Sequence, residues 1–276
     1  HEAYAEVVGR TEGHDKHQAA LANAPRVQGL FGRRKDLRKL AETPLLAAMI
    51  CTLYQERGEH IPRHRLELYK ECIDMLLERR EQKKGVNLSA DYVSLSGDEK
   101  IALLRALAYW MLDNELTSAK TEEAAEILKG RLPYLNRPST YSGDDIIRLF
   151  VERVELLQEE VVGEISFRHR TFQEYLAADS VKHESNFRAL AARAHEDQWR
   201  ETIILAFGMA NKVQQGQLLR GIISKAQRLK TDSLRRQRLL LALACLETGV
   251  EVAPQLRREA LDANRELFPP HSAEEA

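Results

Sequence analysis

The sequence predicts a mainly α-helical protein with one small β-hairpin, followed by α-solenoid-like helices. Three observations lead to this fold class. Apolar residues recur at helical spacing along most of the chain, and two segments of alternating polarity meet at Gly163. After Ala178, helical patterns follow one another with short polar joints. With 276 residues, a formal net charge of −1 and 43% hydrophobic residues, the chain is long enough for two modest domains with apolar cores.

Residues 1–59 are predicted to form a helical subdomain. Thr43-Pro44 disfavours helix at Thr43 and suits Pro44 as the first residue of a new helix, which we expect to end at Gly58. Because the chain begins at His1 inside a helical pattern, we expect it to be a piece of a larger protein.

Residues 60–182 are predicted to form a winged helix. Pro62 opens one helix, and Ser96 with Glu99 forms a capping box at the start of another. Further helices are expected at Thr121–Leu132 and at 143–154, where Ser142 and Asp145 provide the cap. The segments Leu156–Val162 and Glu164–His169 alternate in polarity and predict the two-stranded wing.

Residues 183–268 are predicted to form helical-repeat-like helices, and residues 269–276 a disordered tail. The repeat-like helices are inferred from apolar stripes, although no strict repeat motif recurs. The stripes are Trp199, Ile203, Ile204 and Phe207; Leu218, Leu219, Ile222 and Ala226; Leu239, Leu240, Leu243 and Leu246; and Leu256, Ala260 and Leu261.

His169 stands where the second wing strand gives way to a helix. Thr171 and Glu174 predict a capping box for that helix, with Phe172 and Tyr175 on its apolar stripe. Backbone N–H groups at a helix start can hold an anion. From the spacing alone, His169 is either a packed strand-end histidine or part of an anion site.

Two motifs carry a resemblance to a known family. Residues Phe167, His169, Thr171, Phe172, Gln173, Glu174, Tyr175, Ala177 and Ala178 match the pattern F-x-H-x-[ST]-F-Q-E-[FY]-x-A-A. The Thr43-Pro44-Leu45-Leu46 turn is similar to an [NT]-P-L-L-L motif. Over roughly residues 35–180, the chain therefore resembles NACHT-type signal-transduction ATPases (STAND NTPases), the group that includes NOD-like receptors and bacterial defence proteins.

The resemblance implies a nucleotide-sensing role. It implies that His169 contacts the phosphates of ADP in a closed state and that Pro44 rests against the adenine. ADP or ATP is then the cofactor of the parent protein, and no tightly bound nucleotide is expected on this chain alone. The implied partners are an upstream nucleotide-binding domain, an activating ligand on the C-terminal repeats, and further copies in an oligomer. By analogy alone, the resemblance extends to bacterial anti-phage defence.

The chain is not expected to be an enzyme. It contains no G-x-x-x-x-G-K-[ST] loop and no Ser/His/Asp or Cys/His constellation with local support. His14 and His17 have no third ligand, so no metal site is predicted. Cys51, Cys72 and Cys245 predict buried free thiols in a reducing cytosol. No apolar run approaches the ~20 residues that span a bilayer, so a cytoplasmic location is expected.

Two alternative functions remain. A winged helix can read DNA, but the helix at 143–154 carries Asp144, Asp145, Glu152 and Glu155 against Arg148 and Arg153, and the wing carries Glu159, Glu160 and Glu164. These carboxylates repel phosphates, so DNA binding through the winged helix is not expected. A helical interaction scaffold is the other alternative. Its basic stretch could bind nucleic acid or an acidic partner, although a solvated helix face is the favoured interpretation; the stretch comprises Lys225, Arg228, Lys230, Arg235, Arg236 and Arg238.

Overall fold

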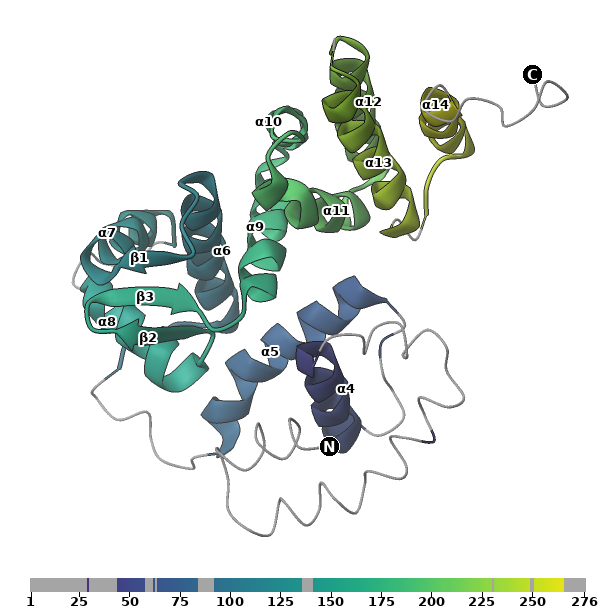
Figure 1. Ribbon diagram of the computed structural model, residues 1–276. Helices are drawn as coiled ribbons and strands as arrows, with labels where there is room; N and C mark the ends of the chain where they lie inside the picture. Colours follow the sequence, from purple (N-terminus) through teal and green to yellow (C-terminus); the bar gives the residue numbers. More distant parts are fainter. Residues whose placement is uncertain are drawn as a thin grey trace, which may run out of the picture. The chain divides into compact units, whose positions relative to one another are not determined.

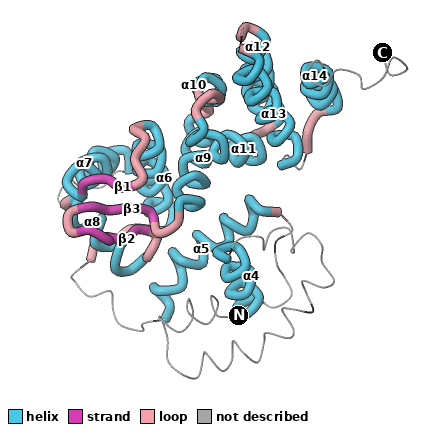
Figure 2. The backbone as a smooth tube through the Cα atoms, viewed as in Figure 1, coloured by secondary structure: helices cyan, strands magenta, loops and turns pink. Residues whose placement is uncertain are grey.

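The computed structural model describes residue 29 and residues 44–57, 62, 64–83, 92–135, 141–229, 231–248 and 251–265. His14, His17 and the tail from Pro269 lie outside these ranges. The chain divides into two compact units, His1–Arg79 and Arg80–Ala276. As predicted, the described part is mainly helical with one small antiparallel sheet (Figures 1 and 2).

The first unit contains α4 (Pro44–Arg57) and most of α5 (Arg65–Lys83). The prediction that Pro44 is the first residue of a helix is confirmed. α5 begins at Arg65, later than the start predicted at Pro62, and its first helical hydrogen bond runs from the Leu68 N–H to the His64 carbonyl (3.0 Å). The buried side of the two helices is made of apolar residues, namely Ala48, Ile50, Leu53, Leu68, Tyr69, Cys72, Ile73, Met75 and Leu77.

Three helices of the second unit begin where the sequence predicted, namely α6 (Gly97–Asp113), α7 (Thr121–Arg131) and α8 (Gly143–Leu149). The 3₁₀ turn η1 (Leu132–Leu135) follows α7, and the π-helical turn η2 (Phe150–Val154) follows α8 within the segment predicted as one helix. At α6 the Glu99 N–H donates to Ser96 Oγ (3.3 Å) and the Ser96 N–H donates to Glu99 Oε2 (2.7 Å). At α8 the Asp145 N–H donates to Ser142 Oγ (3.0 Å). Both predicted caps are confirmed.

The sheet has three strands, one more than predicted. β2 (Leu157–Val161) and β3 (Glu164–Phe167) form the predicted wing around Gly163, whose φ of +83° suits glycine. β1 (Ser118–Lys120) pairs antiparallel with the other side of β3, which gives the order β1-β3-β2. β1 was missed because three residues are too few to show a period. At the wing tip, Val162 is 96% exposed.

α9 (Arg170–Glu184) follows the sheet and is buried on several sides. It packs against α6 and also against α11 (Arg200–Met209). A partly buried ion pair joins Arg105 Nη1 on α6 to Asp179 Oδ2 on α9 at 3.2 Å. The predicted domain boundary at residue 182 falls inside this helix. Its buried residues are Phe172, Gln173, Tyr175, Leu176, Ala177, Ala178, Ser180 and Val181.

Helices after α9 pack in neighbouring pairs. They are α10 (Phe187–Ala192), the 3₁₀ turn η3 (Asp197–Trp199), α11, α12 (Lys212–Gln227), α13 (Asp232–Thr248) and α14 (Pro254–Arg265). α12 packs on α10 and α13, and α13 also packs on α11 and α14 (Figure 1). This arrangement agrees with the predicted solenoid-like region.

The core assignments for these helices are confirmed except at Leu240, Leu243 and Leu261, and Leu243 is partly exposed. Trp199, Ile203 and Phe207 are buried, as are the predicted residues of α12. Leu240 and Leu261 were predicted to face the core, and this is wrong, because they are 41% and 47% exposed. α13 carries an unbroken run of apolar residues, so the sequence could not show which of them point outward.

The cysteines are free thiols, as predicted. Cys72 and Cys245 are buried, whereas Cys51 is partly exposed. Burial raises the pKa of the Cys245 thiol to about 12, so this group is protonated at neutral pH. Within the described ranges, no helix combines the length and apolar character that a membrane crossing requires.

Gly143 is the position where an added methyl group should be least tolerated. A Cβ at Gly143 would lie 2.3 Å from the carbonyl oxygen of Ala125, and backbone atoms cannot rotate away. We expect Gly143→Ala to destabilise the protein by about 2 kcal/mol, in the range typical of overpacking, when unfolding is followed in urea.

Gly130→Ala is the matched control. No atom lies within 4 Å of a Cβ at Gly130 in α7. Since alanine is the better helix former, this variant should be as stable as the wild type or up to about 1 kcal/mol more stable. Equal destabilisation by both substitutions would show that α7 and α8 do not pack this closely.

Candidate functional site

His169 occupies the junction between β3 and α9. Its backbone is extended, with φ −139° and ψ 127°, and it is the N-cap residue of α9. Its carbonyl accepts a hydrogen bond from the Phe172 N–H (3.0 Å), which begins the helical pattern. Its side chain does not cap the helix. The backbone therefore fixes the position of His169 while the imidazole points elsewhere.

The imidazole of His169 is accessible. The residue is exposed, and its ring lies 5.9 Å from the ring of Phe172 at an angle of 59°. Its two nitrogens make no hydrogen bond to any residue that the structure describes. The role of His169 in binding a phosphate stays a prediction.

The surroundings of His169 favour its neutral form. Desolvation by neighbouring protein atoms is the main cause, and the positive charge of Arg168 is the second; together they lower the pKa of His169 below its ordinary value of 6.5. At neutral pH the side chain therefore carries one N–H donor and one acceptor nitrogen.

Both flanking arginines are held by other groups. Arg168 Nε donates to the carbonyl oxygen of Glu155 (3.0 Å), and its own N–H donates to the carbonyl of Leu156 (2.9 Å). Arg170 Nε pairs with Glu174 Oε1 at 3.0 Å. The prediction of Thr171 as the N-cap is wrong: the N-cap of α9 is His169, two residues earlier, and Thr171 lies inside the helix.

Gln173 anchors the start of α9 to the rest of the winged helix. Gln173 is only 5% exposed, and its Nε2 donates to the carbonyl of Leu116 in the turn between α6 and β1 (3.2 Å). No local pattern in the sequence indicates this role, since the acceptor is a backbone group 57 residues away. Phe167 and Phe172, on either side of His169, are buried and complete the support.

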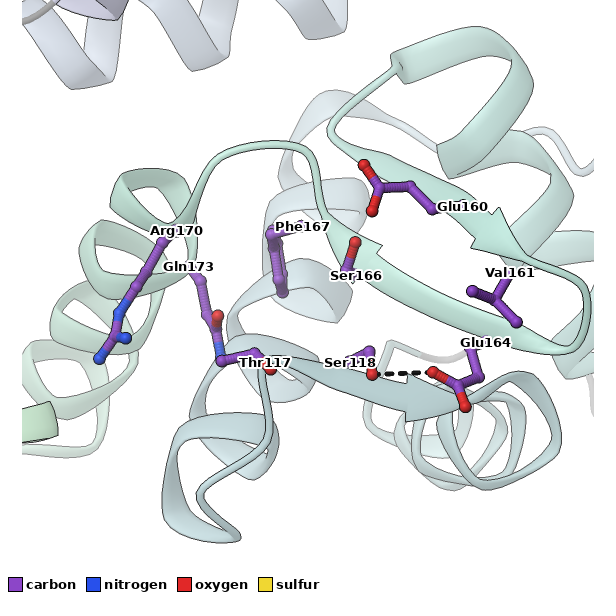
Figure 3. A pocket seen from close by; sticks show the side chains of 9 residues that line it. All are labelled: Thr117, Ser118, Glu160, Val161, Glu164, Ser166, Phe167, Arg170 and Gln173. Atoms are coloured by element: carbon purple, nitrogen blue, oxygen red, sulfur yellow. Dashed lines mark hydrogen bonds between the residues drawn. The ribbon is translucent and has the colours of Figure 1, made fainter.

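A shallow pocket of about 350 Å³ lies between the polar face of the sheet and the start of α9 (Figure 3). Its charged lining residues are Glu160, Glu164 and Arg170, and Arg170 is already paired with Glu174. Ser118 Oγ donates to Glu164 Oε2 at 2.9 Å inside it. Carboxylates of this kind disfavour phosphate, and His169 does not line the pocket. The pocket and the exposed imidazole are separate features.

Pro44, the other predicted contact residue, lies in the first unit at the start of α4. His169 lies in the second unit. A nucleotide contact shared by the two residues stays a prediction.

The helix expected to read DNA in a winged-helix regulator has its arginines engaged. The guanidinium carbons of Arg148 and Arg153 lie 5.0 Å and 4.5 Å from the ring centre of Tyr92. The Tyr92 hydroxyl in turn donates to the Glu152 carboxylate. Asp144 and Glu152 are exposed in this region, as is Arg148.

The described residues contain no group of three or more His, Cys, Asp or Glu side chains that could hold a metal ion.

The bundle of α6, α7 and α8 with a three-stranded sheet and its hairpin wing defines a winged-helix domain. Residues 65–181 match the family model of the winged helix-turn-helix domain C-terminal to NACHT. The chain therefore carries a NACHT-associated winged helix, and a domain of this kind is non-catalytic. No curated protein matches the chain significantly.

The lowered pKa of His169 can be measured by following its imidazole resonances in an NMR titration. We expect a midpoint below 6.5, and Arg168→Gln should raise it because one positive charge is removed. Arg170→Gln is the matched control: the charge of Arg168, and not that of Arg170, contributes to the shift, so the midpoint should stay nearly unchanged.

The same shift links His169 to stability. Because the pKa is lower in the folded state than in the unfolded chain, the contribution of His169 to folding is fully present above pH 6.5. It is lost as the pH falls through the lowered folded value. A midpoint above 6.5 in the folded protein would contradict the described environment.

Proposed function

We propose that this chain is the regulatory, nucleotide-state-sensing part of a NACHT signal-transduction ATPase. In the resting state, ADP held by an upstream nucleotide-binding domain is also contacted by His169, and this contact keeps the protein closed. The observation that carries the proposal is the exposed, rigidly placed imidazole at the start of α9, within a domain of the NACHT-associated family.

The groups at the start of α9 suit a phosphate. The first turn of α9 contains no acidic residue, and free backbone N–H groups and the helix dipole both favour an anion there. Neutral His169 supplies one further N–H donor. A nearby phosphate favours the protonated imidazole, so nucleotide binding should raise the pKa of His169 again. By linkage, ADP retention should then strengthen as the pH falls toward 6.

α9 connects the helices that follow it in the chain to His169 at its start. The same helix contacts α6 within the winged helix and α11 beyond it. A second connection lies between Asp113 at the end of α6 and Arg193 after α10, which form an ion pair. The guanidinium of Arg193 also lies 5.4 Å from the ring of Trp199. An activating ligand on the C-terminal helices therefore acts on the start of α9 through packed elements.

Release of the ADP contact then allows nucleotide exchange and self-association in the cytoplasm. Pro44 is proposed as a second contact, against the adenine. A role in bacterial anti-phage defence follows only by analogy with related NACHT proteins.

DNA binding through the winged helix is the weaker candidate. The engaged state of Arg148 and Arg153 and the exposed Glu159 and Glu160 of the wing all oppose contact with phosphates.

His169→Ala in the parent protein, with its nucleotide-binding domain, should shift the resting state toward activation. A hydrogen bond to a charged phosphate contributes about 1.5–3 kcal/mol. A closed state favoured by roughly a hundred to one is favoured by about 2.7 kcal/mol. Loss of the contact should therefore bring closed and open forms near parity, with an ADP off-rate about 10–100 times faster and oligomers formed without activating ligand.

His183→Ala is the matched control, since His183 is exposed on the same helix at its opposite end. It should leave the ADP off-rate and the oligomeric state unchanged. If the folded His169→Ala protein behaves like this control, the sensing role is ruled out.

The purified 276-residue chain should not turn over ATP. The reason is the missing phosphate-binding loop, because the residues needed to cradle and polarise the phosphates belong to the proposed upstream domain. The measurement is phosphate release with and without Mg²⁺ against a mock preparation. Metal-dependent ATP turnover that copurifies with the folded chain would contradict the proposal that the catalytic residues belong to the upstream domain.

A further inference from the structure

Five cations gather where α12 ends and α13 begins. Lys225 and Arg228 lie at the end of α12, and Arg235, Arg236 and Arg238 lie near the start of α13. Arg228 and Arg236 are exposed, and the other three side chains are partly exposed. α12 and α13 are packed neighbours, and these five residues lie within 14 positions of the sequence where one helix ends and the next begins; we call them the α12–α13 patch.

Four cations of this patch differ from other cations of the second unit in their pairing. Arg220 pairs with Glu259 at 2.8 Å, and Lys212 pairs with Glu251 at 2.7 Å. By contrast, Lys225, Arg228, Arg236 and Arg238 form no ion pair with any residue in the described ranges. Asp232 is the only acidic residue between positions 225 and 238.

Helix stability does not explain where the arginines of α13 lie. The Arg235 N–H donates to the Thr231 carbonyl (3.0 Å), so Arg235 and Arg236 fall in the first turns of the helix. The positive end of the helix dipole lies there, and cations at that end are destabilising. Lys225 and Arg228 at the end of α12 are favourably placed, but they add to the same positive surface.

The composition of the patch suits phosphate groups. Four of its five cations are arginines, whose planar guanidinium groups bind phosphate oxygens bidentately. Single-stranded nucleic acid is bound mainly by aromatic stacking, and neither α12 nor α13 contains an aromatic residue. The cations also spread over two neighbouring helices. This arrangement suits the backbone of a duplex.

We infer that the α12–α13 patch binds the phosphate backbone of duplex nucleic acid without sequence preference. This binding does not depend on His169 or on the nucleotide-sensing role, and it uses a surface outside the winged helix. The helical region of this chain is thereby a contact surface for duplex nucleic acid.

The test is fluorescence anisotropy of a labelled 20-base-pair DNA duplex with the full chain, between 50 and 200 mM NaCl. Four phosphate contacts predict a slope of about −3.6 for the logarithm of the affinity against the logarithm of the salt concentration. Arg228→Gln with Arg236→Gln removes two contacts. The slope should fall in magnitude by about 1.8, and binding at 50 mM salt should weaken at least about tenfold.

Arg257→Gln with Arg258→Gln is the matched control, because these residues are also adjacent to a helix start and exposed, on α14. This variant and Glu159→Gln with Glu160→Gln in the wing should retain both slope and affinity. Thermal unfolding checks that each variant is folded.

Three outcomes overturn the inference. The wild-type chain fails to bind the duplex at 50 mM salt, or the α14 control weakens binding as much as the patch variant does. The third is that polyglutamate, at equal charge concentration, displaces the labelled duplex as well as unlabelled duplex does, which would identify a surface for acidic proteins.

Discussion

The burial of α9 on several sides is the constraint on which the second unit depends. Most surface helices bury one apolar stripe. α9 instead buries residues from Phe172 to Val181, because it closes the winged helix against α6 and supports α11. Its buried alanines, Ala177 and Ala178, have no exposed area and allow close approach of the neighbouring helices. Each fully buried large side chain contributes about 1.5–3 kcal/mol. The folding of the winged helix and that of the helices after α9 are therefore energetically coupled through α9.

This constraint also determines the geometry of the candidate site. The start of α9 is held by Gln173, by the β3 strand and by two buried phenylalanines, so the backbone of His169 has little freedom. The imidazole itself is left exposed. The neighbouring arginines are held by Glu155 and Glu174, which removes the two nearest side chains that could compete with His169 for a ligand. A fixed backbone and an accessible ring are what a sensing residue requires.

Local signals in the sequence predicted most of the fold. The capping residues Ser96, Ser142 and their partners mark helix starts, and Gly163 marks the wing turn. These features depend on neighbours a few residues away. β1 was not predictable, since its three residues are strand only because they pair with β3. The exposure of Leu240 depends on which face of α13 meets its neighbours, and an unbroken apolar run does not contain that information.

The site was predictable in its position but not in its contacts. His169 was singled out by the change from strand to helix spacing and by the family motif. The link from Gln173 to Leu116 and the stacking of two arginines on Tyr92 join residues far apart in the chain. Thr171 shows the opposite error. A capping pattern was present, but the helix begins at Arg170 with His169 as its N-cap, so Thr171 lies inside the helix.

The burial of α9 also bears on how the protein can be divided. The family match ends at residue 181, inside α9, which suggests a natural place to shorten the chain for study. A polypeptide ending there would lose α11 and leave apolar side chains of its last helix in water. Exposed surface of that kind promotes self-association. The shortest fragment that contains this winged helix and stays folded without aggregating is therefore longer than the family match. It extends at least through α11, which covers α9.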